Sequence, residues 1–437
     1  MKIKVYNLFF LLGSLFTFIS LIYLMELKID IVGFSFIFNI LVSIFLLFFS
    51  LKSGVRVILF YSIFNLMFMS FIPYLNYTEN VLIWVNNDFN NFDYIYTNII
   101  IFVFNIIVFV SYFYSSKSFY FIGGSGGGQS NSFNNGKTHS QIKALWVILV
   151  SILCFLILFY AKNFDFYRML VRGIEGDVYE SSHKNPLLSI IIMICRLIPA
   201  FLLMRLIVEK RYYLSYFVFF ILLICNFPSA IPRFLVGFIY LPLLLLIFPN
   251  FRKPVNIALT LILSIVFVFP FLNQFRYFSK DQKISFVPEL SFFNQAHFDA
   301  YQNLADVLRS DFVTYGYQLL GPMFFYIPRS LWESKPYGSG YQLAMNNNYT
   351  FSNISMPFIG EAYINFSYFG IVFFALILGF LMKNIDMKYL LGNIINYNYC
   401  KGLFLCSAVF FLLRGDLMSS FYFLICGIIS FKIVEKI

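Results

Sequence analysis

Charged residues are scarce in this chain. They make up 12% of its 437 residues, whereas 60% are hydrophobic and 22% aromatic. A soluble domain carries roughly 25% charged residues, and a water-soluble fold of this size leaves too much surface exposed to bury so many apolar side chains. The composition therefore excludes a soluble enzyme, a disordered chain and a peripheral protein with one anchor. It predicts an all-α, polytopic integral membrane protein.

Cysteine and histidine are also few, at six and three residues. The cysteines fall in or beside apolar runs and form no C-x-x-C pair, which argues against a disulfide framework or a metal site. The sequence contains no nucleotide-binding loop, HExxH pair or GxSxG elbow. We therefore expect neither a metal nor a cofactor.

Twelve apolar runs are candidate membrane spans, and we expect 10 to 12 of them to be transmembrane helices. The longer ones can cross about 30 Å of hydrocarbon. The first lacks a small-x-small cleavage site and is predicted to be a retained span. The eight longer runs are 5–25, 29–51, 57–74, 94–114, 144–161, 187–208, 255–274 and 362–382, and the four shorter ones are 213–226, 234–248, 402–413 and 417–431.

The net charge of +11 is distributed unevenly between the two sides of the membrane. With the N-terminus inside, the inner segments hold 16 basic and three acidic residues, and the outer segments hold 13 basic and 17 acidic ones. This asymmetry follows the positive-inside rule. It predicts that both termini lie in the cytoplasm, and it gives no reason to expect a nucleic-acid partner.

The segments between the spans divide the chain into five parts. A tract that includes GGSGGGQSNSFNNGK cannot form a core and is predicted to be a flexible cytoplasmic linker. The one large extracytoplasmic loop is rich in aromatic and basic residues, so we expect it to be ordered and functional. The parts are helices one to four (1–114), the linker (115–143), helices five to nine (144–274), the large loop (275–361) and the C-terminal helices (362–437).

Part of the large loop has helical periodicity. Apolar positions alternate with a polar face at helical spacing, which predicts an amphipathic helix lying along the outer membrane–water interface. A helix packed on the core of the loop remains an equal alternative. The first face carries His297, Ala300, Tyr301, Leu304 and Leu308, and the opposite one Asp299, Asn303, Asp306 and Ser310.

Several outer segments carry cations close to the membrane plane. Guanidinium groups bind phosphate oxygens in a bidentate manner, and lysine adds a point charge. Any one of these residues could simply extend to the interface, but together they favour a ligand with a fixed negative charge, such as a lipid-linked diphosphate. They are Arg172, Arg233, Arg276, Arg329, Lys335 and Arg414.

Three other residues are candidates for proton transfer. Glu361 and Asp416 are acidic residues at predicted span ends, where either could act as a general base for an incoming hydroxyl group or orient an arginine. His297 could bind a ligand or shuttle a proton, or it could merely fill the face of its helix.

Three motifs give the chain a family resemblance. PRSLWESKP at 328–336 ends the large loop, FIGEAYINFSYFG at 358–370 opens the next span, and RGDL at 414–417 lies near the end. Together with the topology, these segments resemble the O-antigen and capsular polysaccharide polymerases of the Wzy type.

The resemblance implies transfer of a growing glycan from undecaprenyl diphosphate to a new lipid-linked oligosaccharide repeat unit, at the outer face of the inner membrane. A chain-length regulator protein would be a possible partner. Arg276, Arg329 and Lys335 would clamp the donor diphosphate, with Arg233, Arg172 and Arg414 in support. Glu361 or Asp416 would orient the acceptor hydroxyl group or an arginine. The alternatives are a lipid-linked oligosaccharide flippase or other secondary transporter, an O-antigen ligase, and a non-enzymatic scaffold.

Overall fold

The computed structural model describes residues 28–51, 54–84, 88–118, 143–170, 186–274, 290–391 and 395–437. Every regular element within these ranges is a helix. They are α2 (Ile31–Ser50), α3 (Val57–Phe64), η1 (Asn65–Phe71), α4 (Ile72–Thr78), α5 (Asn91–Ser118), α6 (Ala144–Ala161), α7 (Tyr167–Leu170), α9 (Pro186–Val208), α10 (Tyr212–Cys225), α11 (Arg233–Ile247), η3 (Pro249–Arg252), α12 (Pro254–Leu263), η4 (Ser264–Val268), α13 (Phe269–Gln274), η6 (Leu290–Asn294), η7 (Ala296–Phe298), α14 (Ala300–Arg309), α15 (Tyr317–Met323), α16 (Ser339–Asn346), α17 (Phe358–Ile385), η8 (Asp386–Leu390), α18 (Tyr397–Arg414) and α19 (Leu417–Lys436).

Eight of the described helical segments are long and apolar enough to cross a membrane, and α10 and α11 are shorter apolar helices. This is consistent with the predicted polytopic membrane protein. Eleven of the twelve apolar runs coincide with described helices. The run 5–25 and most of the linker, 119–142, lie outside the described residues. A total of 12 spans therefore stays a prediction.

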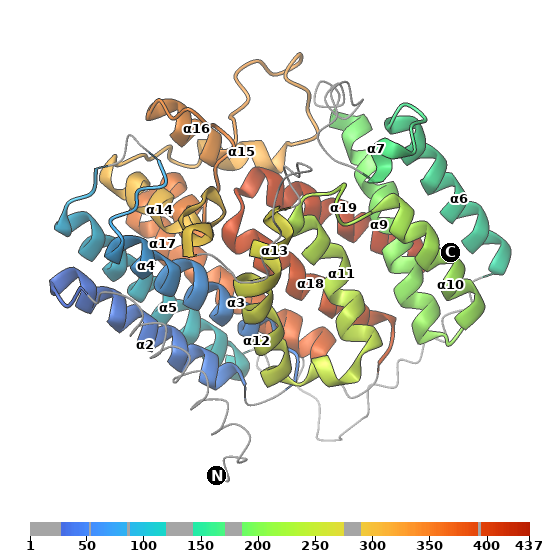
Figure 1. The fold of residues 1–437 in the computed structure, drawn as a ribbon, viewed down its shortest axis with the longest axis horizontal. Helices are drawn as coiled ribbons and strands as arrows, with labels where there is room; N and C mark the ends of the chain where they lie inside the picture. The colour runs from blue at the N-terminus through green and yellow to red at the C-terminus, as the bar shows by residue number, and fades with distance from the viewer. Residues whose placement is uncertain are drawn as a thin grey trace, which may run out of the picture.

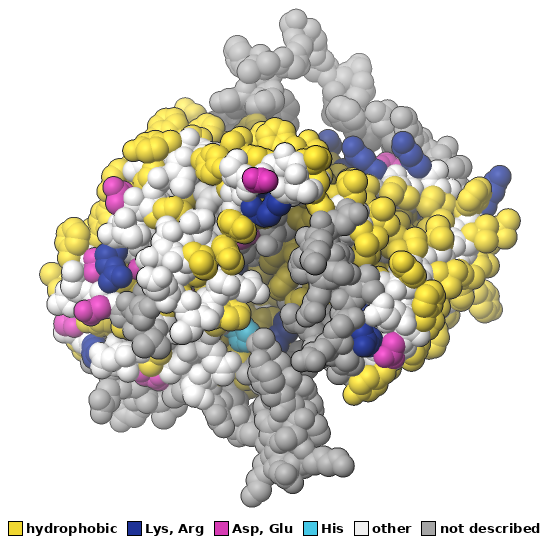
Figure 2. All heavy atoms as spheres, turned by 90° about the horizontal axis from the view of Figure 1, so that it is seen from above, with side chains coloured by type: hydrophobic (Ala, Val, Ile, Leu, Met, Phe, Trp, Pro, Cys, Tyr) yellow, Lys and Arg dark blue, Asp and Glu magenta, His cyan; other side chains and the backbone are white. Residues whose placement is uncertain are grey.

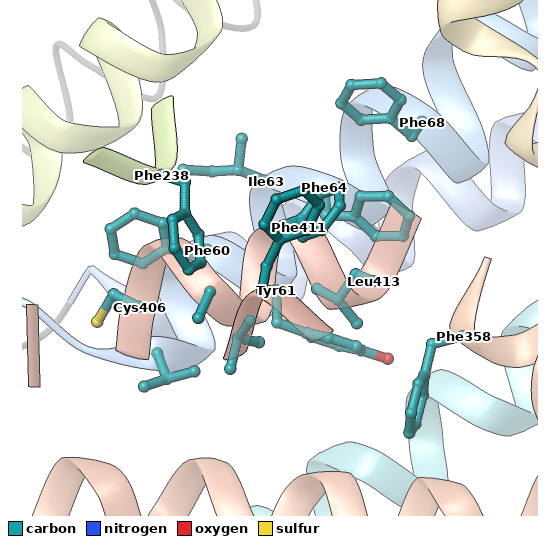
Figure 3. Packing of buried hydrophobic residues seen from close by; sticks show 14 of the residues in the cluster. Phe60, Tyr61, Ile63, Phe64, Phe68, Phe238, Phe358, Cys406, Phe411 and Leu413 are labelled. Carbon is teal, nitrogen blue, oxygen red and sulfur yellow. The ribbon is translucent and has the colours of Figure 1, made fainter. Parts of the chain in front are cut away.

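The centre of the bundle is built from aromatic side chains. The continuous segment from α3 to α4 is apolar all round and is buried along its whole length. The rings of Phe64 and Phe68 stack at 5.4 Å, and both contact Phe410 of α18 edge-on. Figure 3 shows Phe60 and Phe64 of α3 close to Phe238 of α11 and Phe411 of α18. Because apolar helices gain little from leaving lipid, this close packing is what holds them together.

Helix α17 is interrupted near its start. Ser367 has a φ of 53° and a ψ of −140°, so Phe358–Asn365 forms a separate first segment. The carbonyl group of Ile364 accepts hydrogen bonds from the Thr314 backbone N–H at 2.7 Å and from its hydroxyl group at 3.1 Å. Non-helical backbone at this depth is tolerated only where the protein satisfies its polar groups. The predicted span 362–382 therefore begins with a break, and Glu361 lies in the segment before it.

The predicted helix of the large loop is α14, but its predicted position at the interface is wrong. Asp299, Asn303 and Asp306 on its polar face are all 0% exposed. Asn303 accepts a hydrogen bond from the Trp84 indole at 2.8 Å, and Asp306 accepts bonds from Tyr349 and Asn347. The helix packs on α5 and α17. Its polar face is buried because neighbouring segments satisfy it, which periodicity alone does not reveal.

Candidate functional site

Charged residues from distant segments meet where α11 begins and α18 ends. Arg233 is the first residue of α11, Arg414 is the last residue of α18, and Asp416 caps α19. The large loop contributes η7 and α14 to α16, and the last three lie together at one end of the bundle (top of Figure 1). Arg233, His297 and Arg414 form one set of contacts, and Glu361 and Asp416 form a second set around the start of α19. The two sets are joined along the chain from Arg414 to Asp416, and we refer to them together as the outer cluster.

Arg233 and His297 contact each other directly. The Nη1 atom of Arg233 lies 3.3 Å from Nε2 of His297, and both residues are half-buried. A guanidinium group has no acceptor, so it donates and the imidazole Nε2 accepts. Figure 2 shows a histidine beside a basic side chain near the middle of this face. The pair therefore places a fixed positive charge and a titratable ring together at the surface.

Arg414 holds the backbone of this histidine in place. Its Nε atom donates to the His297 carbonyl group at 3.0 Å, and Nη2 lies 3.6 Å from Oδ1 of Asp299. Asp299 is itself buried and accepts bonds from both the backbone N–H and the hydroxyl group of Ser355. His297 is thus fixed by arginines from two different helices. The sequence pattern marked Asp299 only as part of a polar helix face.

Glu361 is almost fully buried, with 1% of its surface exposed. Its Oε2 atom accepts a hydrogen bond from the Ser339 hydroxyl group at 2.7 Å, and Oε1 accepts one from the Leu417 backbone N–H at 2.9 Å. Glu361 therefore joins the start of α16 to the start of α19. Both of its carboxylate oxygens are engaged by the protein itself, and sequence reasoning missed its partner Ser339.

Removing the Glu361 carboxylate is expected to destabilise the protein more than neutralising it. Glu361→Ala leaves the buried Ser339 hydroxyl group and Leu417 N–H without their acceptor, and each such loss costs about 1–3 kcal/mol. Glu361→Gln retains a carbonyl acceptor, so we expect a smaller fall in the unfolding temperature. Thermal unfolding of the two purified variants in detergent tests this order. Equal temperatures would show that the two bonds contribute nothing.

Asp416 is the more accessible of the two acids. Its Oδ1 atom caps α19 by accepting a hydrogen bond from the Ser419 N–H at 2.8 Å, and the side chain is half-buried. Removal from water raises the pKa of its carboxyl group above the ordinary value of 3.8. The second oxygen lies against Gly338, the residue before Ser339. The turn at 338–339 therefore contacts both acids.

Gly338 is the residue that allows this close approach. A Cβ atom at this position would lie 2.0 Å from Oδ2 of Asp416. Gly338→Ala is therefore expected to displace Asp416 or the turn, and to lower the unfolding temperature of the purified protein. Gly237→Ala is the matched control, because a Cβ atom there meets nothing within 4 Å. Equal unfolding temperatures for the two variants would contradict the contact.

Arg329 and Lys335 lie together, but their side-chain N–H groups donate hydrogen bonds to backbone carbonyl groups of the same loop. The Lys335 ammonium group donates to the carbonyl groups of Phe325 at 2.8 Å and Ile327 at 2.9 Å. Arg329 donates to the carbonyl groups of Lys335 and of Pro336, the latter at 3.0 Å. Burial and the neighbouring Arg329 lower the pKa of Lys335. Both residues hold an irregular segment in shape, and their predicted role at a diphosphate stays a prediction.

A pair of exposed aromatic rings flanks the turn at 338–339. The rings of Tyr337 and Tyr341 stack at 4.8 Å, and the guanidinium carbon of Arg329 lies 3.7 Å from the Tyr337 ring centre. These tyrosines are 47% and 37% exposed, respectively. An aromatic face binds cations and partly positive C–H groups such as those of a sugar ring. Tyrosine is common throughout this sequence, so nothing in the sequence singled out Tyr337 and Tyr341 as a pair.

The remaining predicted site residues are not placed by the structure. Arg172 and Arg276 lie outside the described residues. Within the described ranges, no three His, Cys, Asp or Glu side chains gather as they would around a metal ion. Comparison with known proteins gives no relative: no family model, curated protein or solved structure matches the chain.

Proposed function

We propose that this chain is a polysaccharide polymerase that joins undecaprenyl-diphosphate-linked repeat units at the outer face of a bacterial inner membrane, as a Wzy-type glycosyltransferase does. The observation that carries the proposal is the outer cluster, in which Arg233 and Arg414 both contact His297 and Asp416 follows Arg414 by two residues. Cations, a titratable ring and an accessible acid at the ends of apolar helices suit a charged, lipid-linked substrate.

In this proposal Arg233 and His297 bind the donor diphosphate, with Arg414 holding His297 in place and the predicted Arg276 in support. Asp416 takes the proton from the acceptor hydroxyl group while the oxygen of that hydroxyl group attacks the anomeric carbon of the donor. The bond between that carbon and the carrier diphosphate breaks, and the diphosphate leaves with the electron pair. Neutralising the charge that develops on a leaving group accelerates such a step. Tyr337 and Tyr341 offer a face for the acceptor sugar.

The first test is a gel profile of surface polysaccharide from cells with and without the gene, together with their lipid-linked intermediates. If the protein is a polymerase, deletion removes the ladder of bands that polysaccharides of increasing length form on the gel. It leaves a single repeat unit attached at the surface. Single units that remain on the inner leaflet would indicate a transporter instead. An unchanged ladder would overturn both functions.

Transport of the same lipid-linked unit is the second candidate, and the break in α17 is the observation that favours it. Interrupted helices form the binding sites of many secondary transporters, and Ser367 interrupts α17 after the segment that carries Glu361. The outer cluster would then be the exit of the pathway. Ligation of finished glycan to lipid is a third possibility that the same outer cluster would serve.

A further inference from the structure

A second group of charged residues lies at the opposite end of the bundle, on the side predicted to face the cytoplasm. The end of α2, the start of α3, the end of α5 and the α17–η8 junction meet there. A cavity of about 140 Å³ opens between the first three. It is lined by Leu46, Phe49, Ser50, Arg56, Ile58, Phe109, Tyr112 and Phe113. One guanidinium group therefore lies in a cavity that is otherwise mostly apolar.

The acid bound to the cavity-lining Tyr112 already accepts hydrogen bonds from the protein. Asp386 is 0% exposed, and it accepts hydrogen bonds from the Val57 backbone N–H at 2.8 Å and from the Tyr112 hydroxyl group at 2.6 Å. Lys383 lies over the ring of Tyr112, with its ammonium nitrogen 5.2 Å from the ring centre. Arg56 and Lys383 thus bring two positive charges to Tyr112, and Asp386 brings one negative charge.

We propose that this cavity binds the phosphate group of an anionic phospholipid from the inner leaflet. Arg56 supplies the planar donors that suit phosphate oxygens, and Lys383 adds a second charge. Phe113 is 41% exposed at the edge, so the apolar lining continues to the surface that lipid chains cover. Basic pockets between membrane helices on the cytoplasmic side are typical sites for anionic headgroups. A free anion would use the cations but not the apolar lining.

The test is native mass spectrometry of the full-length protein in detergent with added phosphatidylglycerol or phosphatidylcholine. We expect retention of phosphatidylglycerol in preference to phosphatidylcholine, and a loss of about five-fold in the retained fraction for Arg56→Gln and for Lys383→Gln. Arg56→Lys keeps the charge and should lose less than Arg56→Gln. Lys388→Gln is the matched control, since its ammonium group lies against Tyr389 and not against Tyr112, the cavity-lining residue that Lys383 contacts.

If Arg56→Gln, Lys383→Gln and Lys388→Gln all retain the same fraction of phosphatidylglycerol, the proposed binding site is overturned. Displacement of phosphatidylglycerol by millimolar inorganic phosphate would show that the cavity binds a free anion and not a lipid. Having two independent variants, one in the cavity lining and one beside Tyr112, keeps the test decisive if one of them does not fold. The result does not depend on the polymerase proposal, which concerns the other end of the helices.

Discussion

Replacing Asp416 by asparagine is expected to abolish long polysaccharide chains while leaving the protein folded. Asparagine caps a helix as well as aspartate does, so the bond from the Ser419 N–H to residue 416 persists. The negative charge and the ability to take a proton are lost, and loss of a general base costs about 10²- to 10⁴-fold in rate. The ladder and the amount of membrane-inserted protein are measured together.

Asp30→Asn is the matched control for this substitution. Asp30 caps α2 in the same way, with Oδ1 accepting a hydrogen bond from the Gly33 N–H at 2.7 Å, and it also lies at a predicted outer helix end. This variant should form a normal ladder. If Asp416→Asn also keeps a normal ladder, Asp416 is not the base and acts only as a cap.

The pH dependence of the rate follows from the same residue. A general base works in its ionised form, so the rate should fall as the pH falls through the pKa of Asp416. Because removal from water raises that pKa above 3.8, the acid limb should lie at a higher pH than for an ordinary aspartate. The pH–rate profile of the residual activity of Asp416→Asn should lack this acid limb.

Replacing Arg233 by glutamine is expected to have the second large effect. Arg233 faces His297 at the start of α11, and we propose that it binds the donor diphosphate. Loss of a preorganised donor for the leaving group costs about 10²- to 10³-fold in rate. Arg233→Lys keeps the charge but not the planar pair of donors, so it should retain an intermediate rate.

Arg168→Gln is the control for a general effect of outer-face arginines. Arg168 lies in α7, and its Nε atom is 3.3 Å from Oδ2 of Asp165, so it is paired with an acid of its own segment. Its removal should leave the ladder unchanged. A ladder lost equally in both variants would mean that the outer arginines act through folding or insertion and not through a ligand.

Hydropathy and spacing predicted the helices well, because an apolar run long enough to span a bilayer has few other structures available. Periodicity also predicted α14, but the partners that bury its polar face come from residues as distant as Trp84 and Ser355. A local sequence pattern cannot predict such contacts between distant residues. The break at Ser367 was missed for the same reason, since the carbonyl group of Ile364 before the break is satisfied by the distant Thr314.

The candidate site shows the same limit. Residue type and predicted side indicated Arg233, His297, Arg414, Glu361 and Asp416. The structure brings the first three into contact and places the two acids together at the 338–339 turn. Sequence reasoning ranked Arg329 and Lys335 above Arg233. The donors of those two residues bind backbone carbonyl groups of their own loop. It also could not separate the buried Glu361 from the more accessible Asp416. Which donors remain available to a ligand depends on the fold of the loop.

The most direct measurement uses the purified full-length protein in liposomes. Lipid-linked repeat units extracted from the deletion strain are added without an energy source, and products are analysed for chain length and released undecaprenyl diphosphate. Our account predicts a ladder, with one carrier diphosphate released for each new linkage, and neither product from Asp416→Asn. Units that cross the bilayer but remain single, with no carrier released, would contradict it.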